Sequence, residues 1–233
     1  MTRTLRLLLA LLVAGSFPGP SAVLAEPASA PGADPSLNAP YQDPEFERWV
    51  RTFERSGREV YDRREAIVRA TGAEPGQAVA DVGAGTGFFT LMFAEQVGPQ
   101  GRVYAVDISR NFIRNIERRA AANGFENVEG VVNDQASVKL PPESVDVAFI
   151  TNTYHHFEQP RAIMASLHRA LRPGGTVVVI DYRKEGGSGW VRGHVRAGRS
   201  AVAEEIESMG FSLVEDSDLL ERNYFLRFRK VDR

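Results

Sequence analysis

The residues with the clearest chemical potential lie in the stretch VADVGAGTGFF, residues 79–89. An apolar run containing one acid, Asp81, leads into Gly83, Gly85 and Gly87. A strand that runs through a glycine-rich turn into a helix exposes backbone N–H groups and the positive end of the helix dipole, and glycine lets a ligand approach the main chain closely. The stretch therefore predicts a ligand-binding loop, although a glycine motif alone is equally typical of a tight turn.

A second acid, Asp107, ends the next apolar run, twenty positions after Gly87. An acid at this place accepts hydrogen bonds from the ribose hydroxyls of a nucleoside. Both groups are expected at the carboxyl ends of neighbouring strands, where open α/β sheets bind their ligands. The two acids and the glycine loop together predict a nucleoside site.

The spacing of the glycines indicates which nucleoside. Dinucleotide sites use G-x-G-x-x-G, whereas here the spacing is G-x-G-x-G and Phe88 follows. A carboxylate such as Asp81 repels a pyrophosphate and suits a positively charged amine. The site therefore needs a ligand with a ribose, an amine and no phosphate, and S-adenosylmethionine fits this description. The same two residues, Asp81 and Phe88, argue against a nicotinamide-dependent oxidoreductase.

Short apolar runs alternate with helical stretches and must position this loop. The runs occupy residues 78–82, 102–108, 128–132, 145–150 and 176–182. Alternation at this spacing predicts βαβ units and a parallel sheet with right-handed crossovers. After residue 200 a helix, an extended segment and a last strand predict an antiparallel hairpin. The fold class is therefore α/β: one Rossmann-like, doubly wound, mostly parallel seven-stranded sheet.

The N-terminal residues read as a targeting segment followed by a linker. Arg3 and Arg6 precede an apolar run, and small side chains allow cleavage after Ala25, so residues 1–25 are expected to be a secretory signal peptide. A buried N-terminal helix is the alternative; a membrane span needs about 20 apolar residues and is not expected. Residues 26–40, rich in proline and alanine, are expected to be a disordered linker, and residues 41–233 one domain.

Two further segments leave a choice open. An apolar helical stripe at Phe46, Trp49 and Phe53 is expected to form a flap over the site, although it could instead pack on the sheet. The basic, glycine-rich segment 183–199 is either a lid for an anionic or flat substrate or a solvated loop.

Several stretches resemble the class I S-adenosylmethionine-dependent methyltransferases. They are VADVGAGTGFFT, VYAVDIS, VNDQ, VDVAFITNTYHHF and LRPGGTVVVIDY, and the resemblance covers about residues 58–230. It is strongest to the small-molecule branch that includes the ubiquinone and menaquinone enzymes. The resemblance implies a cofactor site for S-adenosylmethionine made of Asp81, Gly83, Ala84, Gly85, Gly87, Asp107, Ile108, Asp134, Gln135, Thr151 and Asn152.

Each of these residues takes an implied role from the resemblance. Asp81 and the glycine loop hold the methionine end, Asp107 takes the ribose hydroxyls and Ile108 flanks the adenine. Asp134 accepts from the adenine amino group with Gln135 beside it. Thr151 and Asn152 border the sulfonium and its methyl group.

The candidate catalytic residues are Tyr154, His155 and His156, just beyond the fourth apolar run. A base is needed only when the methyl acceptor holds its proton tightly, so a histidine here is either that base or a structural residue bonded to the main chain. No metal site is expected, because adjacent side chains diverge and His168 and His194 lie in other segments. The magnesium-dependent catechol-type relatives need an acid where Thr151 stands.

The composition of the chain excludes several classes of protein chemistry and of partner. The chain has 233 residues, a formal net charge of −2 and no cysteine, which excludes disulfides and thiolate chemistry and argues against nucleic acid as a partner. The sequence predicts an exported, periplasmic or secreted methyltransferase acting on an unidentified small molecule, with no obligate protein partner. The alternative is an exported, non-catalytic module that binds a nucleoside or S-adenosyl ligand on the same scaffold.

Overall fold

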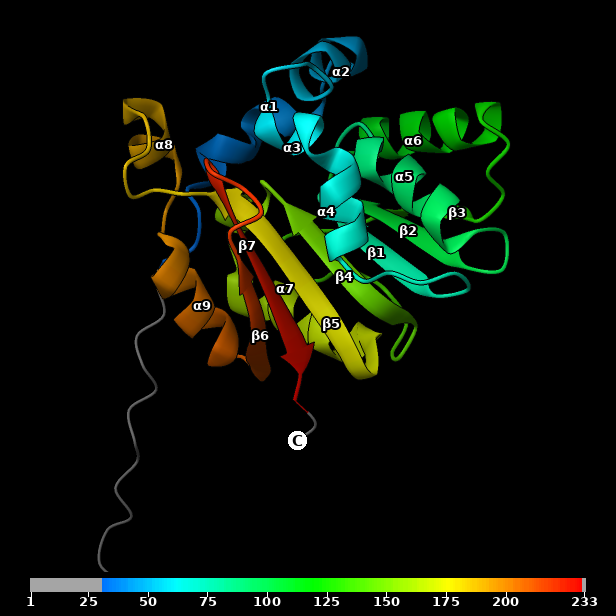
Figure 1. Cartoon of the computed structure of the whole chain (residues 1–233). Coiled ribbons are helices and arrows are strands. Elements are labelled where there is room, and N and C mark those ends of the chain that lie inside the picture. Colours follow the sequence, from blue (N-terminus) through cyan, green and yellow to red (C-terminus); the bar gives the residue numbers. More distant parts are fainter. Residues whose placement is uncertain (1–30, 232–233) are drawn as a thin grey trace, which may run out of the picture.

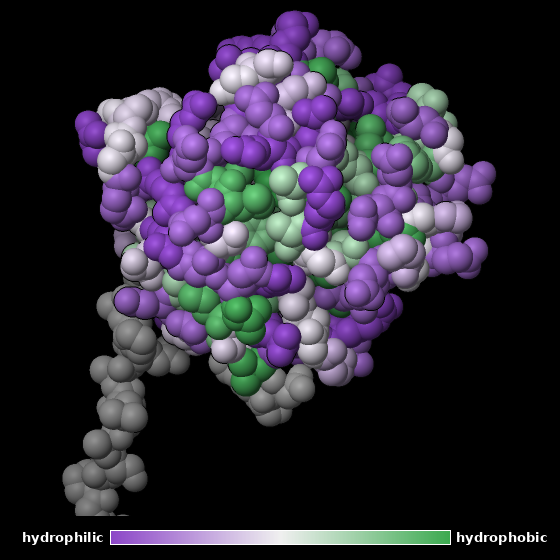
Figure 2. Space-filling view, in the orientation of Figure 1, coloured by the Kyte–Doolittle hydropathy of each residue, from purple (hydrophilic) through white to green (hydrophobic). Residues whose placement is uncertain are grey.

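The computed structural model describes residues 31–231 (Figure 1). The expected signal peptide, residues 1–25, lies outside the described residues, so export stays a prediction. Within residues 31–231 no helix is both long enough and apolar enough to cross a membrane. Figure 2 shows hydrophilic side chains over most of one face, interrupted by smaller hydrophobic areas.

A seven-stranded sheet in the order β3-β2-β1-β4-β5-β7-β6 forms the centre of the domain. The first five strands run parallel, and β7 pairs antiparallel with both β5 and β6. The predicted fold class is confirmed. The strands are β1 Ala78–Val82, β2 Arg102–Asp107, β3 Val128–Val132, β4 Val145–Thr151, β5 Leu171–Tyr182, β6 Phe211–Ser217 and β7 Asn223–Lys230.

Helices cover both faces of the sheet because alternate strand residues point to opposite sides. On β4, Phe149 packs with the cluster that includes α4 and α5, whereas Ile150 packs with the cluster that includes α7 and α9. The helices are η1 Pro35–Asn38, α1 Ala39–Gln42, α2 Phe46–Phe53, α3 Glu59–Asp62, α4 Arg64–Ala70, α5 Phe88–Val97, α6 Arg110–Ala122, η2 Tyr154–His156, α7 Pro160–Ala170, α8 Gly189–His194 and α9 Arg199–Glu207.

The described part of the expected linker, residues 31–40, is packed against the domain. Asn38 is buried, and its side-chain amide donates to the His156 carbonyl at 3.0 Å and to Glu158 Oε1 at 2.8 Å. The Ala33 N–H donates to the Phe157 carbonyl at 2.9 Å. The expectation of a disordered linker over 26–40 is therefore wrong for this part, because distant partners satisfy its polar groups.

Helix α2 is fixed over the glycine loop as the expected flap. Arg119 of α6 makes a bidentate contact with Glu54, at 2.6 and 3.0 Å, and donates to the Thr86 carbonyl at 2.9 Å. The pair is largely shielded from solvent, where a bidentate arginine–carboxylate contact is strong. Figure 1 shows α1 to α3 grouped at the top of the sheet, with α8 beside them.

Candidate active site

The loop after β1 needs glycine at positions 83 and 87, both for its backbone conformation and for lack of space. Gly83 and Gly87 both have φ of +77°, a conformation that side chains disfavour. A Cβ on Gly83 would lie 2.2 Å from Thr153 Cγ2, and one on Gly87 would lie 2.7 Å from Ile116 Cγ1. The loop is thus pressed between the end of β4 and helix α6, with its backbone open to the pocket.

The predicted cofactor residues converge on one pocket. Gly87 alone among them is not part of the lining, because it packs against Ile116. The flap adds Phe53 to the walls, and the segments on either side of it add Tyr41 and Arg58. The predicted residues that line the pocket are Asp81, Gly83, Ala84, Gly85, Asp107, Ile108, Asp134, Gln135, Thr151, Asn152, His155 and His156.

Two buried acids lie at the ends of β1 and β2. Asp81 Oδ2 accepts from Thr90 Oγ1 at 2.6 Å, and Asp107 accepts from the N–H groups of Gly85 at 2.9 Å and Ser109 at 2.8 Å. Burial raises the pKa of Asp81 to about 7 and that of Asp107 to about 6. Such sites favour a cationic ligand, because a nearby positive charge offsets the free-energy cost of burying an ionised carboxylate.

Asp134 and Gln135 are already engaged by the chain itself. Asp134 is largely exposed; its side chain accepts hydrogen bonds from the N–H groups of Ala136 and Ser137 and pairs with Lys139 at 3.0 Å. The hydrogen bond from Ala136 is the main reason why the pKa of Asp134 is lowered. Gln135 Oε1 accepts from the N–H of Glu158 at 3.2 Å. Both side chains line the pocket, and the adenine contact stays a prediction.

The end of β4 presents one free hydroxyl to the site. Thr151 Oγ1 is buried and has no hydrogen-bond partner within the described residues. Asn152 has φ of 48°, a strained conformation held by a 2.7 Å bond from Asn223 Nδ2 to Asn152 Oδ1. Strained backbone of this kind is frequent at functional sites.

Tyr154 does not belong to the site. It is buried in the core, its ring packs against Phe157 at 5.3 Å, and Arg196 lies over it at 5.1 Å. Burial raises its pKa further above the ordinary value for tyrosine. The expectation that Tyr154 is catalytic is wrong, because the 3-10 turn η2 directs it away from the pocket lining.

His155 is held by a buried carboxylate. Its Nδ1 lies 2.7 and 2.9 Å from the two oxygens of Asp181, and its backbone N–H donates to Asp181 Oδ2 at 3.1 Å. Both side chains are almost fully buried. Asp181 thus orients His155 and leaves only the Nε2 of that ring free.

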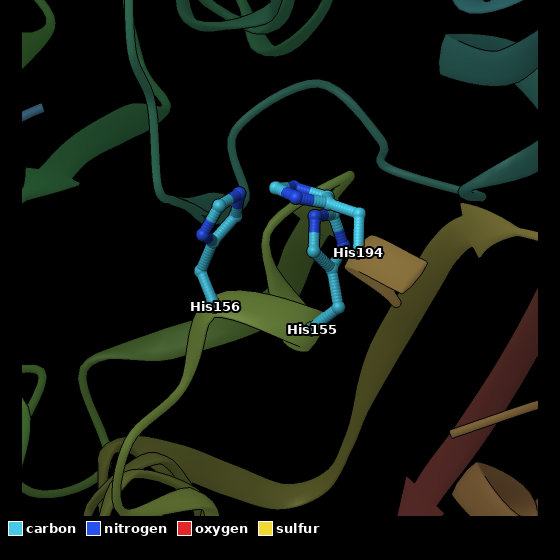
Figure 3. A group of neighbouring side chains, drawn as sticks. All are labelled: His155, His156 and His194. Atoms are coloured by element: carbon cyan, nitrogen blue, oxygen red, sulfur yellow. The ribbon is translucent and has the colours of Figure 1, made fainter. Parts of the chain in front are cut away.

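Three imidazole rings meet beside the pocket (Figure 3). The centroids of His155 and His156 lie 4.2 Å apart, and His194 of α8 lies 5.0 and 5.2 Å from them. Burial lowers the pKa of His156 to about 3, and it also lowers the pKa of His194. The expectation that adjacent histidines diverge is wrong here, because η2 turns both rings toward α8.

Sequence reasoning missed two polar residues beside the flap that reach the pocket. Arg58 lies over the Phe53 ring at 5.1 Å, and burial lowers its pKa. Tyr41 packs against Trp49 at 4.7 Å and against His156 at 5.1 Å. Neither belongs to a motif, and only the position of the flap brings them to the site.

A glycine loop after the first strand, a buried acid ending the second and an antiparallel last strand define a class I S-adenosylmethionine-dependent methyltransferase fold. Residues 73–217 match the family Methyltransf_31, described as a methyltransferase domain. The match covers more than half of the chain, and the chain belongs to this family.

Known relatives agree with this assignment. A demethylmenaquinone methyltransferase of Geobacillus stearothermophilus is 29% identical over 118 residues, 51% of this chain and 50% of the relative. The ubiquinone/menaquinone biosynthesis C-methyltransferase UbiE of Vibrio campbellii is 31% identical over 118 residues, 50% of this chain and 46% of the relative. The chain thus spans about half the length of the curated relatives it matches.

A solved structure shows the same fold over more of the chain. The crystal structure of a SAM dependent methyltransferase from Aquifex aeolicus superposes with a TM-score of 0.69 at 25% identity, covering 85% of this chain and 99% of that one. The cofactor is S-adenosylmethionine. The residues present fit it, since a glycine-rich loop and two buried acids line the pocket for a ligand that carries an ammonium and a sulfonium.

We expect S-adenosylmethionine to bind more weakly as pH falls. The cationic ligand favours ionised Asp81 and Asp107, so affinity is complete above about pH 7 and is lost below it, by up to ~10-fold per pH unit for each group. Calorimetric titration between about pH 8 and about pH 5.5 measures this loss. Asp81→Asn should flatten the upper part of the profile, and equal dissociation constants across the range would contradict the prediction.

The same two acids predict the pH dependence of stability. Their pKa values in the folded chain lie above the unfolded value of about 3.9. The folded state therefore binds more protons than the unfolded state between about pH 4 and about pH 7. Their contribution to the free energy of unfolding should fall as pH rises through this window.

Proposed function

We propose that this protein transfers the methyl group of S-adenosylmethionine to a flat, hydroxylated aromatic small molecule. The observation that carries the proposal is that one pocket combines the glycine cradle and buried acids with an aromatic wall. Phe53, Phe157 and Tyr182 line the wall with Tyr41. Aromatic side chains favour a flat acceptor through stacked and edge-to-face contacts.

The relatives support the choice of acceptor. Two of them are described as demethylmenaquinone and ubiquinone/menaquinone methyltransferases, names that imply ring-shaped, oxygen-bearing acceptors. Arg58 and Tyr182 add polar groups to the same walls, and both lie near enough to influence each other's pKa. An acceptor with a ring and a hydroxyl matches this mixture of apolar and polar groups.

The residues of this chain then act mainly by positioning. When bound, S-adenosylmethionine would supply a methyl carbon: its bond to sulfur breaks with the electron pair left on sulfur as the bond to the acceptor forms, and the acceptor gives up one proton to solvent. Asp81 and Asp107 hold the cofactor, and Phe53 of the flap excludes water from the glycine loop. Holding two reactants in line contributes up to about 7–11 kcal/mol in ideal cases.

The test is formation of S-adenosylhomocysteine with a panel of acceptors. Hydroquinones and phenols are expected to give turnover, whereas an aliphatic amine is not. Tyr182→Leu should raise the KM for the acceptor by ~10-fold through loss of ring contact, while the dissociation constant of the cofactor stays unchanged. His168→Gln is the matched control, because His168 lies away from the pocket and its Nε2 lies 3.0 Å from the Val231 carbonyl oxygen. Turnover of the amine alone, or an unchanged KM in Tyr182→Leu, would contradict the proposal.

A further inference from the structure

Three of the four histidines of this chain meet at one point. The chain has no cysteine and four histidines, and His155, His156 and His194 each offer a ring nitrogen within 4.8 Å of the other two. The first two lie on η2 and the third on α8, from distant parts of the sequence. Figure 3 shows the three rings grouped, with a gap in this view between His156 and the other two.

The distances suit a metal ion after a small adjustment. Tetrahedral zinc with nitrogen ligands at about 2.0–2.1 Å separates those nitrogens by roughly 3.4 Å, so closure needs shifts of roughly 1 Å. Helix α8 can supply them, since it lies in a glycine-rich segment, with Gly186 at φ of +74° just before it. The side chain of His194 is only partly buried.

Asp181 prepares His155 for coordination. Metal-binding histidines usually donate their second ring N–H to a carboxylate, which fixes the tautomer and raises the basicity of the free nitrogen. The contact of Asp181 with Nδ1 at 2.7 Å has this arrangement and leaves Nε2 as the ligand atom. The carboxylate itself is almost fully buried, so the orientation is rigid.

His156 provides an independent sign of a missing partner. Its Nδ1 is buried and makes no hydrogen bond within the described residues. A buried polar atom without a partner costs about 1–3 kcal/mol, and such atoms are rare in folded proteins. The imidazole of His156 is therefore incompletely satisfied, and its ring lies beside that of His155 with centroids 4.2 Å apart.

We propose that His155, His156 and His194 bind one divalent transition-metal ion, zinc being the best match. Imidazole ligands suit zinc, copper, iron and nickel, whereas magnesium and calcium prefer oxygen. Three protein ligands leave a coordination position open, as in catalytic zinc sites. His155 and His156 line the cofactor pocket, so an ion held by them would lie beside that pocket.

Metal binding would prevent His155 from acting as a general base. A ring whose Nδ1 binds Asp181 and whose Nε2 binds the ion has no nitrogen left to take a proton. An ion there would hold the acceptor's hydroxyl oxygen and lower its pKa, as metals do for bound water, so that the hydroxyl would give its proton to solvent before the methyl group is transferred. This role rests on the proposed function, whereas binding of the ion does not.

The test is titration of the full-length chain, carrying a histidine-free affinity tag and stripped with a chelator, with zinc sulfate alone. We expect one zinc per chain, visible absorption when cobalt(II) replaces it, and no comparable binding of magnesium. Asp181→Asn should weaken zinc binding by roughly 10–100-fold, and His194→Ala by more. His168→Ala is the matched control and should bind zinc like the unaltered chain.

Tryptophan fluorescence gives a second measurement of zinc binding, which can be used if the histidine variants fold poorly. Trp190 stacks on His194 with centroids 4.4 Å apart and is 58% exposed, so zinc should change its fluorescence. The change should persist in Trp49→Phe and vanish in Trp190→Phe. No stoichiometric zinc, or equal affinity in His194→Ala and the unaltered chain, would overturn the proposal. Asp107→Ala should lose the cofactor and keep zinc, so failure of the function and failure of the metal site are distinguishable.

Discussion

Replacing Asp107 with alanine is expected to weaken binding of S-adenosylmethionine by ~100-fold or more. Hydrogen bonds to a charged group contribute about 1.5–3 kcal/mol each, and the predicted contact with the ribose includes two hydroxyls. The substitution also removes the acceptor for the Gly85 N–H, 2.9 Å from Asp107 Oδ2, which loosens the glycine loop. Calorimetric titration with S-adenosylmethionine and S-adenosylhomocysteine measures the loss.

Two controls separate recognition from general damage. Glu129→Gln changes an acid on the neighbouring strand β3 that pairs with Arg102 on the surface, and it should leave cofactor affinity unchanged. Asp107→Asn keeps one oxygen acceptor and should bind with intermediate affinity. If Asp107→Ala bound the cofactor like the unaltered chain, the role given to this acid would be wrong.

Gly83→Ala is expected to lower the free energy of unfolding by about 2–5 kcal/mol and to abolish cofactor binding. The left-handed backbone accounts for about 1–2 kcal/mol and the contact with Thr153 for about 1–3 kcal/mol, since the new Cβ would lie 2.2 Å from Thr153 Cγ2. Denaturant unfolding with and without S-adenosylhomocysteine measures both effects.

Gly76 provides the matched control for that substitution. It has φ of +85° and no atom within 4 Å of an added Cβ, so Gly76→Ala should show only the backbone contribution, about 1–2 kcal/mol. Equal losses of stability in the two variants would show that the contact with Thr153 contributes nothing.

Local patterns account for most of what the sequence predicted correctly. The expected strands at 78–82 and 128–132 have the observed bounds of β1 and β3. Strand β1 is buried throughout, and buried parallel strands are short continuous apolar runs, whereas β3 lies at the edge of the sheet. Strand β5 begins at Leu171 rather than at 176. Its first residues, RPGG, read as a turn, and a shift in register against β4 between Val145 and Val147 accommodates them.

The sequence by itself determined the order of strands and helices, the glycine loop and the two acids beside it. These depend on periodicity and on backbone conformations that neighbouring residues set. Only the tertiary structure decided which way Tyr154 points, that Asn38 packs beside η2, and that His194 meets His155 and His156. Each of these depends on contact between segments far apart in the chain, and no local pattern encodes such a contact.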